Sequence, residues 1–175
     1  MKADEARYSL WLLPAREEAE ELGATMRELA LLFGIPAFAP HATLHGDLGL
    51  EPEKIRKAGR DLAAGLAPLE LRVRAVELSP EYFRSLFLRF EDDEEFSKLQ
   101  ELSAERFRTR RGLSPFPHLS LSYGEGPGRS DREALAEQLS FRFQGRRIVF
   151  PSIAFAESSS EIPIDQWKVL EEYPL

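Results

Sequence analysis

The sequence contains no cysteine, and this absence removes several kinds of chemistry at once. Disulfide bonds, thiolate metal sites and cysteine nucleophiles are all excluded. The chain also lacks any apolar run that approaches the ~20 residues needed to cross a bilayer. Its first ten residues, MKADEARYSL, are charged and hold no apolar segment, so no signal peptide is visible. We therefore expect a cytoplasmic protein that does not associate with membranes.

Positive charge is the second shortage, since 23 lysines and arginines face 30 aspartates and glutamates, for a formal net charge of −7. General nucleic acid binding depends on many contacts between basic side chains and phosphates, so this balance argues against a nucleic acid coat protein. A local pocket for one small phosphate compound stays open. With 175 residues, 43% of them hydrophobic, the chain is expected to form one domain (1–175) with two lobes.

Hydrophobic periodicity predicts alternating strands and helices. The segment 8–13 is short, apolar and stopped by Pro14, which is typical of a buried strand. Apolar residues spaced by three and four positions over 16–33 predict an amphipathic helix. Further helices are expected over 51–66, 92–108 and 130–139, and further strands over 40–45, 69–76, 82–90, 116–123, 146–155 and 166–170. This order predicts an α+β fold in which two antiparallel sheets, with helices outside, face each other across a central cleft.

A short motif occurs twice and holds two of the three histidines. It is Pro-His-x-(Thr/Ser)-Leu, at residues 40–44 and 117–121. Residues i and i+2 of a strand point to the same face, so each copy presents its histidine and its hydroxyl together. These pairs are His41 with Thr43, and His118 with Ser120. The other residues of each strand are expected to point into the core, which gives each strand one polar and one apolar face.

Two histidines that flank a phosphate form a natural acid–base pair, because an imidazole with a pKa near ~6.5 can accept or donate a proton at neutral pH. One would take a proton from attacking water, and the other would protonate the leaving oxygen. The hydroxyls of Thr43 and Ser120 would hold the non-bridging oxygens. No spacing typical of a metal site occurs, so neither a metal nor another cofactor is expected. The residues leave the assignment open, with His118 favoured as the base and His41 as the acid.

These motifs resemble the two-histidine phosphoesterase superfamily, and within it the cyclic phosphodiesterase branch. The likeness is carried by residues 8–14, 38–44, 82–88 and 118–123. It implies a bilobal fold and metal-independent opening of 2′,3′-cyclic nucleotides, or of ADP-ribose 1″,2″-cyclic phosphate, to a phosphomonoester. It also implies catalysis by His41 and His118, phosphate binding by Thr43 and Ser120, and a water- or phosphate-contacting role for Tyr123.

Three aromatic residues, Phe83, Tyr123 and Trp11, are candidates to stack on a base or ribose, since an aromatic face suits any base. Plain core packing is the alternative for each. His45 departs from the family pattern. It is expected on the same face as His41, where it either contacts the substrate or lies at a solvated strand end.

The substrate and the activity each have an alternative. The RNA 2′,3′-cyclic phosphodiesterase branch, historically called 2′-5′ RNA ligases, usually has threonine at the position of Ser120 and a basic residue soon after it. This chain has residues 122–124, Ser-Tyr-Gly, at that place, which favours a small nucleotide over RNA ends or 2′–5′ oligonucleotides. Known members of the cyclic phosphodiesterase branch also have cysteines that can pair, and this chain has none. A nucleotide-binding module without catalysis is the non-enzyme alternative, and we expect a monomer.

Other patterns have a plain structural interpretation beside a functional one. Four arginines just before the second motif could grip a diphosphate or an RNA backbone, or only complement a helix end. They are Arg106, Arg108, Arg110 and Arg111. The glycine-rich segment 124–128 lacks the Lys-Ser/Thr end of a phosphate loop and is expected to be a turn. The acidic run 91–95 predicts a helix start rather than a metal site, and Ser130 with Glu133 predicts a capping box.

Overall fold

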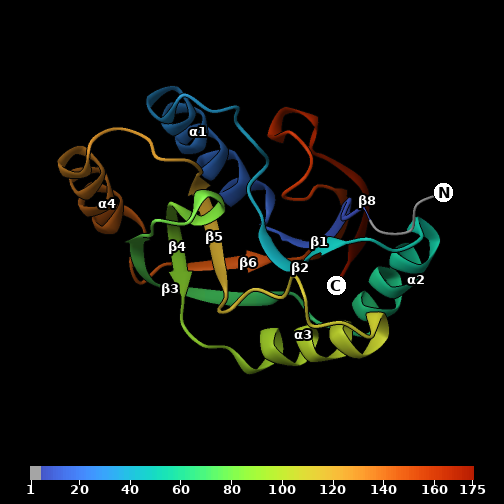
Figure 1. Cartoon of the computed structure of the whole chain (residues 1–175). Coiled ribbons are helices and arrows are strands. Elements are labelled where there is room, and N and C mark those ends of the chain that lie inside the picture. Colours follow the sequence, from blue (N-terminus) through green and yellow to red (C-terminus); the bar gives the residue numbers. More distant parts are fainter. Residues whose placement is uncertain (1–4) are drawn as a thin grey trace.

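The computed structural model describes residues 5–175 and has two four-stranded antiparallel sheets with helices packed around them (Figure 1). This confirms the predicted α+β fold; residues 1–4, the start of the charged N-terminal segment, lie outside the described part. The first sheet has the order β2 (Ala42–Leu48), β1 (Tyr8–Leu13), β7 (Ser152–Glu157) and β8 (Lys168–Pro174). The second has the order β5 (His118–Ser122), β4 (Leu86–Phe90), β3 (Leu69–Leu78) and β6 (Arg147–Phe150).

In the described part of the chain, four α-helices surround the sheets: α1 (Arg16–Phe33), α2 (Pro52–Ala63), α3 (Glu94–Phe107) and α4 (Arg129–Phe143). Helix α1 packs against β5 and α3 packs against β2, so a helix lies against each of the two motif strands. Buried apolar side chains of both sheets form one continuous cluster with these helices. None of the described helices is long and apolar enough to cross a bilayer.

Both motif strands are sheet edges, and they contact each other near the centre of the molecule (Figure 1). Their apolar residues point into the core as expected, with Ala42, Leu44, Leu119 and Leu121 at most 1% exposed. An edge strand leaves backbone groups without partners. The loop of residues 108–117, which leads from α3 into β5, supplies some of these partners to β2. The Gly46 N–H donates to the Gly112 carbonyl over 2.7 Å, and the Ser114 hydroxyl donates to the Thr43 carbonyl over 2.8 Å.

Each motif strand has a bulge directly after its hydroxyl residue. In β2, Thr43 pairs with Trp11 and His45 with Leu10, which leaves Leu44 as the extra residue. In β5, Ser120 pairs with Phe87 and Ser122 with Leu86, which leaves Leu121 as the extra residue. A bulge shifts the alternation of side chains by one position. The polar face of each motif strand therefore ends at its hydroxyl.

Two segments that were each predicted as one strand divide into two elements. The segment 82–90 divides into a 3₁₀ turn, η1 (Tyr82–Arg84), and the strand β4. The segment 146–155 divides at Pro151 into β6 and β7, which belong to different sheets. Proline has no N–H to continue a ladder, so the chain changes sheets there.

The helix starts show one confirmed and one wrong prediction. Asp93 accepts a hydrogen bond from the Phe96 N–H over 2.8 Å and caps α3, so the acidic run 91–95 is a helix start. The predicted capping box of Ser130 and Glu133 is wrong, because α4 begins at Arg129. Glu133 instead accepts a hydrogen bond from Arg129 over 2.8 Å, across one turn of the helix.

Replacement of Gly112 should reveal how tightly the 108–117 loop is docked on β2. Gly112 has a φ of 84°, and a Cβ atom there would lie 1.9 Å from the Gly46 carbonyl oxygen. Gly65 has a φ of 77° with no atom within 4 Å of its Cβ position, so it provides a matched control. We expect Gly65→Ala to cost about 1 kcal/mol from backbone strain alone. Gly112→Ala should cost more than about 3 kcal/mol, because the loop must also move.

Urea unfolding of the two variants measures this difference. Equal losses of unfolding free energy in both would show that the loop is not held against β2 as described.

Candidate active site

A cavity of about 260 Å³ lies between the two motif strands, and all seven predicted site residues line it. They are Trp11, His41, Thr43, Phe83, His118, Ser120 and Tyr123. His41 and Thr43 come from β2 and the residue before it, whereas His118 and Ser120 come from β5. The fold thus brings together two histidines and two hydroxyls from segments that are far apart in the sequence.

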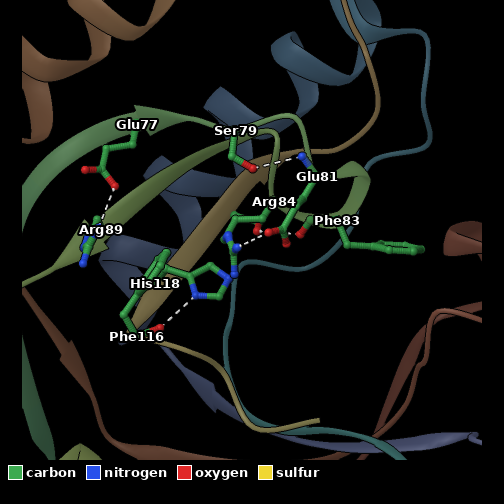
Figure 2. Close-up of polar contacts among 9 residues, drawn as sticks. Glu77, Ser79, Glu81, Phe83, Arg84, Arg89, Phe116 and His118 are labelled. Atoms are coloured by element: carbon green, nitrogen blue, oxygen red, sulfur yellow. Dashed lines mark hydrogen bonds and ion pairs between the residues drawn. The ribbon is translucent and has the colours of Figure 1, made fainter. Parts of the chain in front are cut away.

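The two imidazoles are held by equivalent hydrogen bonds, each from the ring to a backbone carbonyl two residues earlier in the chain. The Nδ1 atom of His41 lies 2.7 Å from the Ala39 carbonyl oxygen, and that of His118 lies 3.0 Å from the Phe116 carbonyl oxygen (Figure 2). Each of these carbonyls precedes the motif proline, and a residue before proline is biased toward an extended backbone. Since a carbonyl only accepts, each Nδ1 carries the proton and donates it. In the neutral rings Nε2 is then the free, basic nitrogen.

Burial keeps both histidines neutral. It lowers the pKa of His41 from its ordinary value of 6.5 to about 4, against a smaller opposing effect of the Ala39 carbonyl. It also lowers the pKa of His118 to about 4; the Phe116 carbonyl opposes this shift, the Arg84 guanidinium adds to it, and the Glu81 carboxylate opposes it. A charged imidazole loses hydration in these surroundings, which is why the proton is disfavoured. At neutral pH the unliganded site therefore holds two neutral imidazoles.

Trp11 is 2% exposed and stacks face to face on His41, with ring centroids 3.7 Å apart and planes inclined by 12°. Its indole therefore fixes the imidazole ring and leaves little surface for a ligand. Trp11 thus lines the cavity and packs on His41 at the same time.

The remaining aromatic residues form one wall of the cavity. Tyr123 is 3% exposed and stacks on Phe38 at 4.1 Å between centroids. Burial raises the pKa of its hydroxyl, opposed by hydrogen bonding with Ser120, so Tyr123 is a neutral phenol. Phe83 is 37% exposed, and its ring lies nearly parallel to that of Trp167 at 6.1 Å. Of the three predicted aromatic residues, Phe83 alone presents a large free surface.

His45 corrects a prediction. It neither contacts the cavity nor lies at a solvated strand end; it is 0% exposed. Its Nε2 donates to the Arg111 carbonyl over 2.8 Å, and its Nδ1 pairs with the Ser103 hydroxyl at 2.7 Å. The bulge at Leu44 turns it away from the face of His41. His45 ties β2 to α3 and to the 108–117 loop.

The arginine cluster also lies away from the cavity. Arg106 pairs with Asp61 at 2.5 Å, and Arg110 binds both carboxylate oxygens of Glu101 at 2.7 and 2.8 Å. None of the four arginines is among the described residues that line the cavity.

Sequence reasoning missed several residues of the cavity, above all Arg84, Glu81, Asp47 and Trp167. None belongs to a repeated motif. Arg84 lies within segment 82–88, which carries part of the family likeness, and Glu81 directly precedes that segment; this was the only signal for the two. Among residues 5–175, no group of three or more histidines, aspartates or glutamates is arranged to hold a metal ion.

Comparisons with known proteins place the fold. A family model described as "Cyclic phosphodiesterase-like protein" matches residues 7–175, and no curated protein matches the sequence. The crystal structure of TT0787 of Thermus thermophilus superposes with a TM-score of 0.63 at 23% identity, covering 97% of each chain. E. coli LigT complexed with 3′-AMP gives 0.58 at 13% identity, covering 98% of each chain. Kluyveromyces marxianus Usb1 with uridine monophosphate gives 0.50 at 11% identity, covering 98% of this chain and 99% of that chain.

The buried histidines predict how stability depends on pH. Between about pH 4 and pH 6.5 the unfolded chain binds more protons at His41 and His118 than the folded chain does. Stability should therefore rise with pH across this window and be lost as the pH falls. Calorimetry should find a lower Tm at pH 5 than at pH 7. The double variant His41→Gln, His118→Gln should lose less on the same change, and an equal loss in both proteins would contradict the assignment.

Proposed function

This chain belongs to the cyclic phosphodiesterase-like family of two-histidine phosphoesterases, and from that membership we propose that it is a metal-independent cyclic phosphodiesterase. The proposed substrates are 2′,3′-cyclic nucleotides or ADP-ribose 1″,2″-cyclic phosphate, which it opens to a phosphomonoester. The observation that carries the proposal is the pair of identically held imidazoles, His41 and His118, in one cavity with Thr43 and Ser120.

The proposed reaction takes place between the two Nε2 atoms. One neutral imidazole removes a proton from water, and the water oxygen forms a new bond to phosphorus. The bond from phosphorus to one ring oxygen breaks, and the other histidine, protonated on Nε2, gives its proton to that oxygen. Both Nδ1 atoms keep their protons on the backbone carbonyls throughout.

Burial disfavours both imidazolium ions when no substrate is bound. The histidine that acts as the acid therefore has to take up its proton together with the substrate. A phosphate anion between the rings favours the charged form of a nearby histidine. Beside His118 the Arg84 guanidinium opposes protonation and the Glu81 carboxylate favours it. We propose His118 as the base and His41 as the acid, because no guanidinium acts on His41.

The hydroxyls of Thr43 and Ser120 would donate to the non-bridging oxygens, where negative charge grows in the transition state. In the unliganded site the Ser120 hydroxyl donates to the Phe83 carbonyl over 3.2 Å, and it would turn this proton to a bound phosphate. The effect of Ser120 on the pKa of Tyr123 supports a positioning role for that phenol.

A small nucleotide suits the dimensions of the cavity. Its volume of about 260 Å³ lies just below the roughly 300–1,000 Å³ of small-molecule sites. This space suits a phosphate and a sugar, with the base extending over the exposed ring of Phe83 and its neighbour Trp167. The nucleotides held by two proteins of this fold, 3′-AMP in LigT and uridine monophosphate in Usb1, support a nucleotide ligand. We also propose that the chain acts as one domain and as a monomer.

Removal of either histidine tests the mechanism. His41→Ala and His118→Ala should each reduce turnover of a 2′,3′-cyclic mononucleotide by about two to four orders of magnitude while the protein stays folded. Arg110→Gln, which lies away from the cavity, is the matched control and should keep full activity. Losses of only a few-fold in both histidine variants would refute paired acid–base catalysis.

A substrate panel with and without a chelator tests the rest of the proposal. The panel holds 2′,3′-cyclic mononucleotides, ADP-ribose 1″,2″-cyclic phosphate and RNA with a cyclic end, with the product isomer identified by phosphorus NMR. We expect the small compounds to react faster and EDTA to leave the rate unchanged. Faster hydrolysis of RNA would favour the RNA 2′,3′-cyclic phosphodiesterase alternative. Ligand binding without hydrolysis of any compound would indicate a nucleotide-binding module.

A further inference from the structure

The cavity has a shortage of positive charge. Arg84 is the only lysine or arginine among the described residues that line it, whereas two carboxylates, Asp47 and Glu81, also line it. Both histidines are neutral in the unliganded site, and the hydroxyls carry no charge. Hydrolysis of a cyclic phosphate turns a singly charged diester into a monoester that approaches two negative charges at neutral pH. Apart from a histidine that takes up a proton with the ligand, Arg84 is the only described residue of the cavity that can compensate this charge.

The guanidinium of Arg84 is held beside the reacting position. Its Cζ atom lies 4.8 Å from the ring centroid of Phe116, and the side chain is only 14% exposed. Phe116 also packs edge-on against His118, at 5.5 Å between centroids. Figure 2 shows the guanidinium next to the imidazole of His118. The aromatic ring therefore supports a cation and a catalytic imidazole together.

The hydrogen-bonding capacity of Arg84 is only partly used. One terminal nitrogen donates to the Glu81 carboxylate over 2.6 Å, and the buried Nε has no partner among the described residues. The Glu81 side chain is 63% exposed, and ion pairs with such solvent access contribute little stability. Arginine binds phosphate oxygens through paired, charge-assisted hydrogen bonds. An entering phosphate can therefore replace Glu81 as the partner of Arg84 with only a small loss of free energy.

We propose that Arg84 binds the non-bridging oxygens of the reacting phosphate and exchanges Glu81 for them when the ligand enters. The catalytic consequence rests on the proposed function, whereas phosphate binding does not. Because negative charge grows during the reaction, Arg84 should stabilise the transition state and the product more than the substrate.

A second arginine supplies a matched control. The Cζ atom of Arg89 lies 4.1 Å from the same Phe116 ring centroid, and its side chain pairs with Glu77 at 3.5 Å (Figure 2). Arg89 is not among the cavity residues. Arg84 and Arg89 thus share an aromatic partner and each has a carboxylate partner, and they differ in access to the cavity.

Binding of inorganic phosphate, measured by isothermal titration calorimetry at neutral pH, tests the proposal without any reaction. Arg84→Gln should weaken binding by roughly 10- to 100-fold, as expected for charge-assisted hydrogen bonds. Arg84→Lys should recover part of the loss, and Arg89→Gln should stay within about twofold of the unaltered protein. Glu81→Gln should tighten binding by about two- to tenfold, because the competing carboxylate is gone.

Phosphate affinity is expected to fall in Arg84→Gln and to rise in Glu81→Gln. These opposite changes separate a role in binding from a structural role, since a general loss of structure would weaken binding in every variant. If Arg84→Gln does not fold, Arg84→Lys and Glu81→Gln still decide the question. Absence of phosphate binding in the unaltered protein, equal effects of Arg84→Gln and Arg89→Gln, or weaker binding in Glu81→Gln would each overturn the proposal. Phosphate binding that depends on Arg84, without hydrolysis of any cyclic phosphate, would refute the proposed function and leave this inference standing.

Discussion

The cavity depends on how the open edge of β2 is satisfied. Backbone groups that are buried without partners cost free energy, and an edge strand has a row of them. Here the 108–117 loop supplies the partners through Gly112 and Ser114, and His45 adds a side-chain bond to the same loop. Because this loop runs directly into β5, the bonds that close the edge of β2 also determine where His118 lies relative to His41. The same hydrogen bonds therefore satisfy the edge of β2 and position the two histidines relative to each other.

Burial then determines the charge of the site. The imidazoles are packed against aromatic rings, His41 on Trp11 and His118 against Phe87 and Phe116. Such surroundings favour neutral rings, so a proton is stabilised in the site only together with an anion. Coupling of proton uptake to ligand binding follows directly from the packing. An exposed pair of histidines would lack this coupling, because water would stabilise the imidazolium with or without a ligand.

The elements and strand faces that depend on local sequence pattern could be predicted from the sequence. The periodicities of 8–13 and 16–33 predicted both elements with their observed bounds, and strand alternation placed the histidines and hydroxyls of both motifs on one face. The alternation failed at His45, because a bulge at Leu44 depends on pairing with β1 and leaves no mark on the sequence itself. Arg84 was missed for a related reason. Its segment has the composition of a strand, and only the 3₁₀ turn before β4 directs this side chain into the cavity.

The two motif copies are nearly equivalent in backbone, and their surroundings make them chemically different. Each has a carbonyl before a proline that holds Nδ1, and each has a bulge after its hydroxyl. A symmetric pair of histidines would have no reason for one to act as base and the other as acid. The surroundings differ in charge, since Arg84 lowers and Glu81 raises the pKa of His118, whereas neither acts on His41. In the proposed reaction a phosphate takes the place of Glu81 on Arg84, which leaves a guanidinium beside His118 and none beside His41. The proposed assignment of base and acid therefore depends on two charged side chains outside both motifs.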